Sequence, residues 1–410
     1  MSQPWVVQLR RIARFNYGEA LPSDDRRQGD VPVVGSGGST DHHASANTGS
    51  PVIVIGRKGS VGSVQWFDEP VFAIDTAFFV DQHCTPWDLR WLYYVFQASN
   101  FGDSSQDVGI PGLSRDWAYS QLVPAPPPLE EQRRIVDFLD DQVLRIDELL
   151  ERRATQGLLI EEELREASAE LLLGQNVEGA RVPTRLTPWA KDKPLHWREI
   201  PARYLCTINT GSGDTVDADP DGSYPFYVRS DTAERSNRYT FDCDAVLTSG
   251  DGAGVGKVFH RVSGRFHAHQ RVYVLTDFRQ IGADYFYFYF SSFFRNMALD
   301  GSAKSTVDSV RRDMIAGMPF LVPPFNEQGG IVDVLQRQHR ATSEGLQILG
   351  EATRLLEERK RAVITAAVTG ELNVTTARPI GVGKWVPNVG ASVDSATAAQ
   401  VQAPSIGGIG

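Results

Sequence analysis

The chain has 410 residues, of which 41% are hydrophobic and 22% charged, a composition typical of a globular protein with two or three domains. Because no segment approaches the roughly 18 apolar residues of a membrane span, and the N-terminus lacks a secretory signal, we expect a cytoplasmic protein with no membrane partner. The net charge of −10 argues against non-specific coating of DNA, which needs clustered Lys and Arg, but it permits local basic patches.

The first elements in chain order are short apolar runs between glycine and proline turns. Strands are predicted at 53–55, 71–74 and 77–80. The first two are expected to frame a tight turn, in which Gly tolerates positive φ. We assign this structural role to Gly56, Gly59 and Gly62. Direct approach of the turn backbone to a ligand phosphate is the alternative.

A long helix is predicted next, in segment 127–178. Pro is well suited to a first helical turn. The start of the helix is therefore expected in the stretch that contains Pro127, Pro128, Glu131 and Gln132. Apolar residues then follow at alternating steps of about three and four, the seam spacing of a coiled coil. The seam residues are Ile135, Leu139, Val143 and Ile146. The seam weakens near Gly157.

The second half also begins with short strands, at 245–247 and 271–275, around the glycine-rich stretch SGDGAGVGK. This stretch is no P-loop, because Asp251 stands where the first Gly is required and Val258 where the hydroxyl is required. We align Gly56 with Gly250 and Gly62 with Gly256. The loop is therefore interpreted as structural in both halves, and its second copy comprises Gly250, Gly252, Gly254 and Gly256.

A second long helix is predicted in segment 323–374. Its start repeats the first one, with Pro323, Pro324, Glu327 and Gln328. Its seam comprises Ile331, Leu335, Leu346, Leu349 and Leu356. Two long amphipathic helices most simply bury their seams against each other; the alternative is that each packs on its own domain.

The segment that starts the first helix recurs 196 positions later, with Pro-Pro, Glu-Gln, Ile-Val-Asp and Leu matched. The chain is therefore two copies of one module and of α+β class, with two globular α/β domains separated by two long helices. The expected organisation is a first domain at 1–126, a helix at 127–178, a second domain at 179–322, a helix at 323–374 and a flexible tail at 375–410.

The sequence offers no catalytic constellation. Val322-Pro323-Pro324-Phe325 is similar to the Asn/Asp-Pro-Pro-Tyr/Phe site of amino-methyltransferases, but Val322 stands in place of the polar residue. His267 and His269 have no evident third ligand for a metal. The three cysteines are too few and too scattered for a disulfide framework or a zinc site. We expect neither catalytic nor metal-binding residues.

Duplicated modules on a rigid spacer are suited to reading two half-sites on a DNA duplex. The candidate phosphate contacts lie around the glycine loops and near the ends of the modules. They are Arg57, Lys58, Arg115, Lys257, Arg261, Arg265, Arg311 and Arg312. For each one, a solvated surface charge is the alternative interpretation.

Two stretches, PPLEEQRRIVDFLDDQVLRIDELL and PPFNEQGGIVDVLQRQ, each follow a variable module, and LLEERKRAVITAAVTGEL ends the second helix. This arrangement resembles the specificity subunit of type I restriction-modification systems. The resemblance implies a non-catalytic reader of a bipartite, asymmetric site on double-stranded DNA, with an antiparallel coiled coil as the ruler. It also implies two adenine-N6 methyltransferase subunits and restriction subunits as partners, which would carry S-adenosylmethionine, ATP and Mg²⁺.

Two other functions remain open at this point. The chain could be a self-contained DNA methyltransferase or a fragment of one, although the altered Pro-Pro motif opposes this. It could also be a coiled-coil scaffold whose two domains bind proteins.

Overall fold

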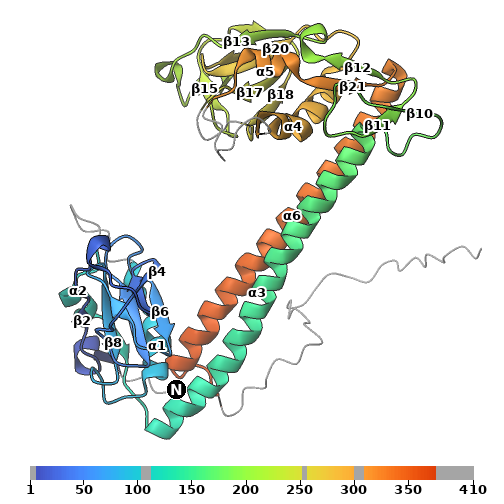
Figure 1. Ribbon diagram of the computed structural model, residues 1–410. Coiled ribbons are helices and arrows are strands. Elements are labelled where there is room, and N and C mark those ends of the chain that lie inside the picture. Colours follow the sequence, from blue (N-terminus) through green and yellow to red (C-terminus); the bar gives the residue numbers. More distant parts are fainter. Residues whose placement is uncertain (1–5, 103–111, 252–255, 300–308, 375–410) are drawn as a thin grey trace, which may run out of the picture. The chain divides into compact units, whose positions relative to one another are not determined.

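The computed structural model describes residues 6–102, 112–251, 256–299 and 309–374. Gly252, Gly254 and the tail 375–410 lie outside these ranges. The chain divides into two compact units, of which unit 1 comprises residues 1–145 and 359–410 and unit 2 comprises residues 146–358. Each unit contains a globular domain and one end of the two long helices (Figure 1). Within the described ranges we find no helix with the length and hydropathy of a membrane span.

Unit 1 is built on a four-stranded sheet of order β2-β8-β5-β6, with a three-stranded sheet of order β4-β3-β7 and a β1-β9 pair. Its strands are β1 (Val6–Gln8), β2 (Asn16–Tyr17), β3 (Val31–Gly35), β4 (Gly38–His43), β5 (Val52–Gly56), β6 (Val64–Phe67), β7 (Phe72–Ala73), β8 (Ala77–Asp81) and β9 (Leu122–Pro124). Its shorter helices are α1 (Leu89–Ala98) and α2 (Arg115–Ser120).

Strand β5 separates two apolar cores of unit 1, because successive side chains of a strand point to opposite faces. Ile53 and Ile55 belong to the larger core with α1, whereas Val52 and Val54 belong to a smaller core with the second sheet. The run is apolar at every position because both faces of the strand are buried.

Unit 2 contains four-stranded sheets of order β13-β20-β17-β18 and β15-β14-β19-β16, with β12-β21 and β10-β11 pairs. Its strands are β10 (Arg181–Pro183), β11 (Asp192–Pro194), β12 (Arg198–Pro201), β13 (Thr207–Thr210), β14 (Tyr224–Tyr227), β15 (Glu234–Ser236), β16 (Phe241–Asp242), β17 (Ala245–Ser249), β18 (Phe259–Val262), β19 (Arg265–Ala268), β20 (Val272–Thr276) and β21 (Pro319–Val322). Its shorter helices are α4 (Ala283–Leu299) and α5 (Arg312–Gly317).

The two domains share one topology, which confirms the predicted duplication. The order β2-β8-β5-β6 in unit 1 matches β13-β20-β17-β18 in unit 2. The parallel pair β3–β7 likewise matches the parallel pair β14–β19, and the terminal pair β1–β9 matches β12–β21. The predicted strands at 53–55, 71–74, 77–80, 245–247 and 271–275 correspond to β5, β7, β8, β17 and β20.

One predicted neighbour was wrong. The strand that follows the first glycine turn and pairs with β5 is β6, with Ile55 opposite Val64. The predicted strand 71–74 instead forms β7, which pairs in parallel with β3. The sequence of β6, VQWF, mixes polar and aromatic residues, and its side chains are only half-buried, so its hydrophobic signal is weak.

Helices α3 (Leu129–Leu172) and α6 (Phe325–Val368) pack together and run antiparallel (Figure 1). In unit 1, Ile135 near the start of α3 shares a core with Ile364 near the end of α6. In unit 2, Leu172 at the end of α3 shares a core with Leu335 near the start of α6. The predicted pairing of the two helices is therefore confirmed.

The weak part of the seam has a structural explanation at Gly157. A Cβ atom at this position would lie 3.4 Å from Leu349 Cδ2 and 3.9 Å from Leu346 Cδ2. Two leucines of α6 thus lie opposite Gly157, at ordinary contact distance from a Cβ atom there. The other predicted seam residues are buried or half-buried: Leu139, Val143, Ile146, Ile331 and Leu356.

The module repeat extends to the ends of the long helices. Gly174 follows α3 with φ of 62°, and Gly370 follows α6 with φ of 77°. A glycine in the left-handed region is a common helix stop, because it carries no Cβ. Since these glycines keep the offset of 196 residues, positions along the two helices can be matched one by one.

Candidate nucleic-acid interface

The repeated Glu-Gln pair joins each long helix to its domain. Gln132 is fully buried; its Oε1 accepts from the backbone N–H of Asp88 at 2.9 Å, and its Nε2 donates to Pro127 O at 2.6 Å. In unit 2, Gln328 Oε1 accepts from Gly282 N–H at 2.8 Å, and Nε2 donates to Pro323 O at 3.0 Å. In each unit, one glutamine side chain thus links the proline turn to the segment that precedes a domain helix, α1 in unit 1 and α4 in unit 2.

The glutamates of the two pairs have different environments. Glu327 accepts from Trp197 Nε1 at 3.0 Å and lies 2.9 Å from His196 Nε2. Glu131 is exposed. The prolines lie just before the helices, and Pro128 O and Pro324 O accept from the N–H groups of Glu131 and Glu327.

The first glycine turn connects β5 to β6 and depends on missing side chains. A Cβ on Gly56 would lie 2.1 Å from Ser60 O, and one on Gly62 would lie 2.5 Å from Gly102 N. Gly59 and Gly62 also have positive φ, of 78° and 80°. Sharp reversal and close backbone contact therefore require these glycines.

Three of the predicted cations lie beside this turn. Arg57 and Arg115 both stack on Tyr17, with their Cζ atoms 5.1 and 4.7 Å from the ring centroid. Lys58 lies 3.8 Å from Asp75. Tyr17 is 44% exposed and both arginines are half-buried, so the ring reaches the surface with two arginines beside it. This combination suits phosphate and base contacts.

The second glycine turn is shifted by one residue from the predicted alignment. The diagnostic hydrogen bonds are Arg57 N–H to Thr76 O at 2.9 Å and Gly250 N–H to Arg271 O at 2.8 Å. Arg57 therefore matches Gly250, and Gly56 matches Ser249, the last residue of β17. Gly62 and Gly256 both have positive φ, which supports their pairing. The predicted alignment of Gly56 with Gly250 misplaced the end of β17 by one residue, because the second turn has a glycine at the position that Arg57 occupies in the first.

Unit 2 carries a cationic pair that the sequence did not reveal. Arg229 and Arg271 lie 3.1 and 2.9 Å from the two carboxylate oxygens of Asp251, which sits in the second glycine turn. His269 lies nearby, since its Nδ1 accepts from the backbone N–H of Arg271 at 3.1 Å. Burial, and then the charge of Arg229, lower the pKa of His269. In the sequence, only the acidic residue Asp251 within a glycine turn pointed to this pair, because the two arginines lie about twenty residues away on either side of Asp251.

The five predicted cations of unit 2 are not gathered in one patch. Arg261 is bound by Asp244 and Asp284 at 3.0 and 2.8 Å, and Arg265 by Asp242 at 2.9 Å. These ion pairs compete with phosphate for both side chains. Arg312 donates to Ile208 O at 3.3 Å. Lys257, Arg311 and Arg312 are exposed.

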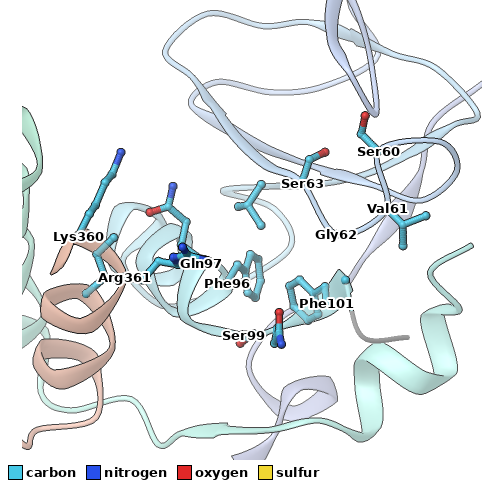
Figure 2. Close-up of a pocket in the computed structure, with 14 residues that line it drawn as sticks. Ser60, Val61, Gly62, Ser63, Phe96, Gln97, Ser99, Phe101, Lys360 and Arg361 are labelled. Atoms are coloured by element: carbon cyan, nitrogen blue, oxygen red, sulfur yellow. The ribbon is translucent and has the colours of Figure 1, made fainter. Parts of the chain in front are cut away.

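A pocket of about 470 Å³ opens in unit 1 beside the first glycine turn (Figure 2). Its wall comprises Ser60 to Val64, the end of α1 with the segment after it, and one turn of α6. Lys360 and Arg361 of α6 lie on one side together with Gln97, and Ser60 and Ser63 lie on the other side.

The decisive comparison is with protein families. A family model described as the type I restriction modification DNA specificity domain matches residues 3–156 and, a second time, residues 195–349. The chain belongs to this family. The two matches fall on the two modules that the repeat and the shared topology define.

Individual relatives of this specificity-domain protein are more distant. The type I restriction enzyme EcoDI specificity subunit of Escherichia coli is 29% identical over 182 residues, which cover 44% of this chain and 39% of that protein. The match thus spans well under half of that relative. A chain from a structure of assembly and conformational transition in the type I R-M system has a TM-score of 0.64 at 16% identity, covering 91% of this chain and 99% of that one. The S subunit from M. genitalium has a TM-score of 0.42 at 13% identity, covering 89% and 96%.

The specificity-domain fold accounts for residues considered above as possible catalytic or metal groups. Val322 is buried at the end of β21 and pairs with Arg198 of β12. His267 is buried and lies 3.1 Å from Thr240 Oγ1 and 3.4 Å from Asp217 Oδ2. Within the described ranges, His, Cys, Asp and Glu form no cluster suited to a metal ion.

Proposed function

We propose that this chain is the DNA sequence-specificity subunit of a type I restriction-modification complex. Each domain reads one half of a bipartite, asymmetric site on double-stranded DNA, and the antiparallel helices α3 and α6 set the length of the unspecified spacer. Two adenine-N6 methyltransferase subunits and the restriction subunits dock on the chain. S-adenosylmethionine, ATP and Mg²⁺ belong to these partners.

The observation that carries this proposal is that the two domains share one fold but have different polar side chains at equivalent positions of the glycine turn. The hydrogen bonds match Arg57 to Gly250, and the next residue is Lys58 in unit 1 and Asp251 in unit 2. A cation in the first turn therefore corresponds to an anion in the second. Unit 1 stacks two arginines on Tyr17, whereas unit 2 holds two arginines on Asp251. Equivalent frames with different donors and acceptors are what two different half-sites require.

Base readout needs positioned groups, and the turn geometry supports such positioning. Rigid turns fix side chains without further loss of conformational freedom on binding. The glycines of the first turn close it against the segment at Gly102, and Asp251 restrains its arginine pair through both carboxylate oxygens. Both clusters are therefore largely formed before DNA arrives.

The test is to co-express the chain with its candidate methyltransferase subunit and to map N6-methyladenine across the host genome. The proposal predicts a single bipartite motif, modified only when this chain is present. S-adenosylmethionine binding by the isolated chain would instead indicate a self-contained methyltransferase. A well-folded complex that neither methylates nor binds DNA would indicate a scaffold.

A further inference from the structure

The pocket beside the first glycine turn has an unusual charge for this chain. Fourteen described residues line it, of which Lys360 and Arg361 are both cationic and none is acidic. The chain as a whole carries a net charge of −10. A concave site with concentrated positive charge is therefore exceptional here and calls for an anionic ligand.

Stabilisation of the helix end does not account for these two cations. A helix dipole acts on side chains in the last turn. Helix α6 ends at Val368, so Lys360 and Arg361 lie about two turns before its end. Both side chains instead line the pocket formed with the globular domain (Figure 2).

The glycine turn supplies the wall of the pocket but few of its donors. The N–H groups of Val61, Gly62 and Ser63 donate to Gly59 O, Gly56 O and Ser60 O within the turn. These backbone donors are used, so the turn is not the phosphate cradle of a P-loop. An anion in this pocket would be held chiefly by side chains.

The accessible lining includes polar side chains that can bind an anion. Phe96 and Phe101 line the pocket but are 0% and 1% exposed, so they form its base and offer little surface to a ligand. Ser60 and Asn100 are exposed and can donate to an anion. A compact oxyanion would find cations, a hydroxyl and an amide here.

Gln97 adds a group whose bonding is incomplete. Its Nε2 lies 2.7 Å from Tyr93 Oη, and its buried Oε1 has no hydrogen-bond partner. With the amide rotated by 180°, Oε1 would lie beside the Tyr93 hydroxyl and Nε2 would take the buried position that now lacks a partner.

We propose that this pocket of unit 1 binds a phosphate group through Lys360 and Arg361. The phosphate comes either from the DNA backbone, which rests on the proposed function, or from a free nucleotide. The volume of about 470 Å³ lies within the range of about 300–1,000 Å³ for small-molecule sites, so it has room for the sugar attached to the phosphate.

The second module differs at the position of one of these two cations. The helix offset of 196 residues places Leu164 at the position of Lys360 and Arg165 at that of Arg361. One of the two cations is therefore replaced by an apolar residue. The module repeat itself provides a tolerated substitution, Lys360→Leu.

The experiment titrates the full chain with three probes: pyrophosphate, ATP and a labelled DNA duplex at several salt concentrations. The variants are Lys360→Leu with Arg361→Ala, and Lys360→Arg as the charge-preserving rescue. The matched control is Arg354→Ala on the same helix, because Arg354 is bound to Glu358. Thermal unfolding of each variant checks that the fold is retained.

If DNA is the source, the double variant weakens duplex binding and lowers the slope of log affinity against log salt by about two, one for each lost phosphate contact. If a nucleotide is the source, wild type binds ATP or pyrophosphate and the double variant loses this binding. In either case Lys360→Arg retains binding of the relevant probe, and Arg354→Ala resembles wild type.

Binding of all three probes that is unchanged in the double variant overturns the inference, as does wild type that binds none of them. These results are distinct from failure of the proposed function. Methylation of a bipartite motif with an inert pocket leaves the proposed function intact. If the double variant loses pyrophosphate binding but the co-expressed complex methylates no DNA, the inference about the pocket holds and the proposed function fails.

Discussion

The side-chain oxygen of Gln132 accepts a hydrogen bond from the backbone N–H of Asp88, forty-four residues away along the chain. Asp88 in turn caps α1 by accepting from Trp91 N–H at 2.9 Å. The start of a long helix and the start of a domain helix are thus fixed by one buried amide. The same arrangement recurs at Gln328 and Gly282. These hydrogen bonds therefore explain why Gln is the second residue of the repeated Glu-Gln pair.

Replacement of either glutamine by alanine is expected to destabilise its own unit. Gln132→Ala or Gln328→Ala leaves a backbone N–H and a carbonyl, mostly part-buried, without these partners, which costs at most about 1–3 kcal/mol for each group. Urea denaturation measures the loss. Gln347→Ala, at an exposed position on α6, is the control and should leave the unfolding midpoint unchanged.

Gly62→Ala should destabilise unit 1 more than Gly264→Ala destabilises unit 2. Both residues have positive φ, of 80° and 87°, so both substitutions carry the left-handed penalty of about 1–2 kcal/mol. A Cβ at position 62 would additionally collide with Gly102 N at 2.5 Å, whereas position 264 has open space. Equal losses of unfolding free energy would refute the close-packing role of the first turn.

Alanine substitutions at two helical glycines distinguish the effect of helix propensity on stability from the effect of packing. Gly345→Ala should stabilise the helix pair by about 0.5–1 kcal/mol, because its Cβ enters open space and alanine favours helix. Gly157→Ala should gain more, since its Cβ would also make ordinary van der Waals contact with Leu349 Cδ2 at 3.4 Å. A smaller gain at position 157 than at 345 would contradict the seam contact. Thermal unfolding ranks the two variants.

Unit 2 should lose a specific contribution to stability in acid. The backbone N–H of Asp214, and then Arg238, lower the pKa of Asp217 from 3.8 to about 2. Because the folded pKa is lowered, the contribution is present above pH 3.8 and is lost as the pH falls through about 2. The melting temperature of wild type should therefore fall more steeply across this window than that of Asp217→Asn. Asp231→Asn, at an exposed site, should follow wild type.

The arginine pair on Tyr17 should contribute to DNA binding. Arg57→Ala with Arg115→Ala removes both guanidinium groups from the exposed ring. Loss of two phosphate contacts lowers the salt slope of binding by about two. If these arginines read bases instead, the slope stays near wild type and discrimination between sequences falls by about 1–3 kcal/mol for each base contact. No change in either quantity would exclude both roles.

The sequence predicted the duplication, the two long helices and their pairing because these features leave local, periodic signals. The Pro-Pro start is repeated, and the seam spacing persists from Ile135 to Ile146 and from Ile331 to Leu356. Gly157 weakened the pattern in α3, but Leu346 and Leu349 of α6 lie opposite it, which the sequence of a single helix cannot show.

The candidate site was only partly predictable. Arg57, Lys58 and Arg115 were selected for their charge, and the structure brings them to one turn. Arg261 and Arg265 were selected on the same ground but are bound to aspartates, and the pair around Asp251 went unnoticed. Ion pairs between distant positions depend on how strands are placed beside one another, and charge in a sequence carries no information about that placement.

The most direct test of the central claim exchanges residues 1–125 for the first domain of another member of the family. Genome-wide mapping of N6-methyladenine then follows co-expression with the methyltransferase subunit. The account predicts a new bipartite motif in which one half-site has changed while the other half-site and the spacer length are preserved. A motif that stays unchanged, or one in which both halves change together, would contradict the assignment of one half-site to each domain.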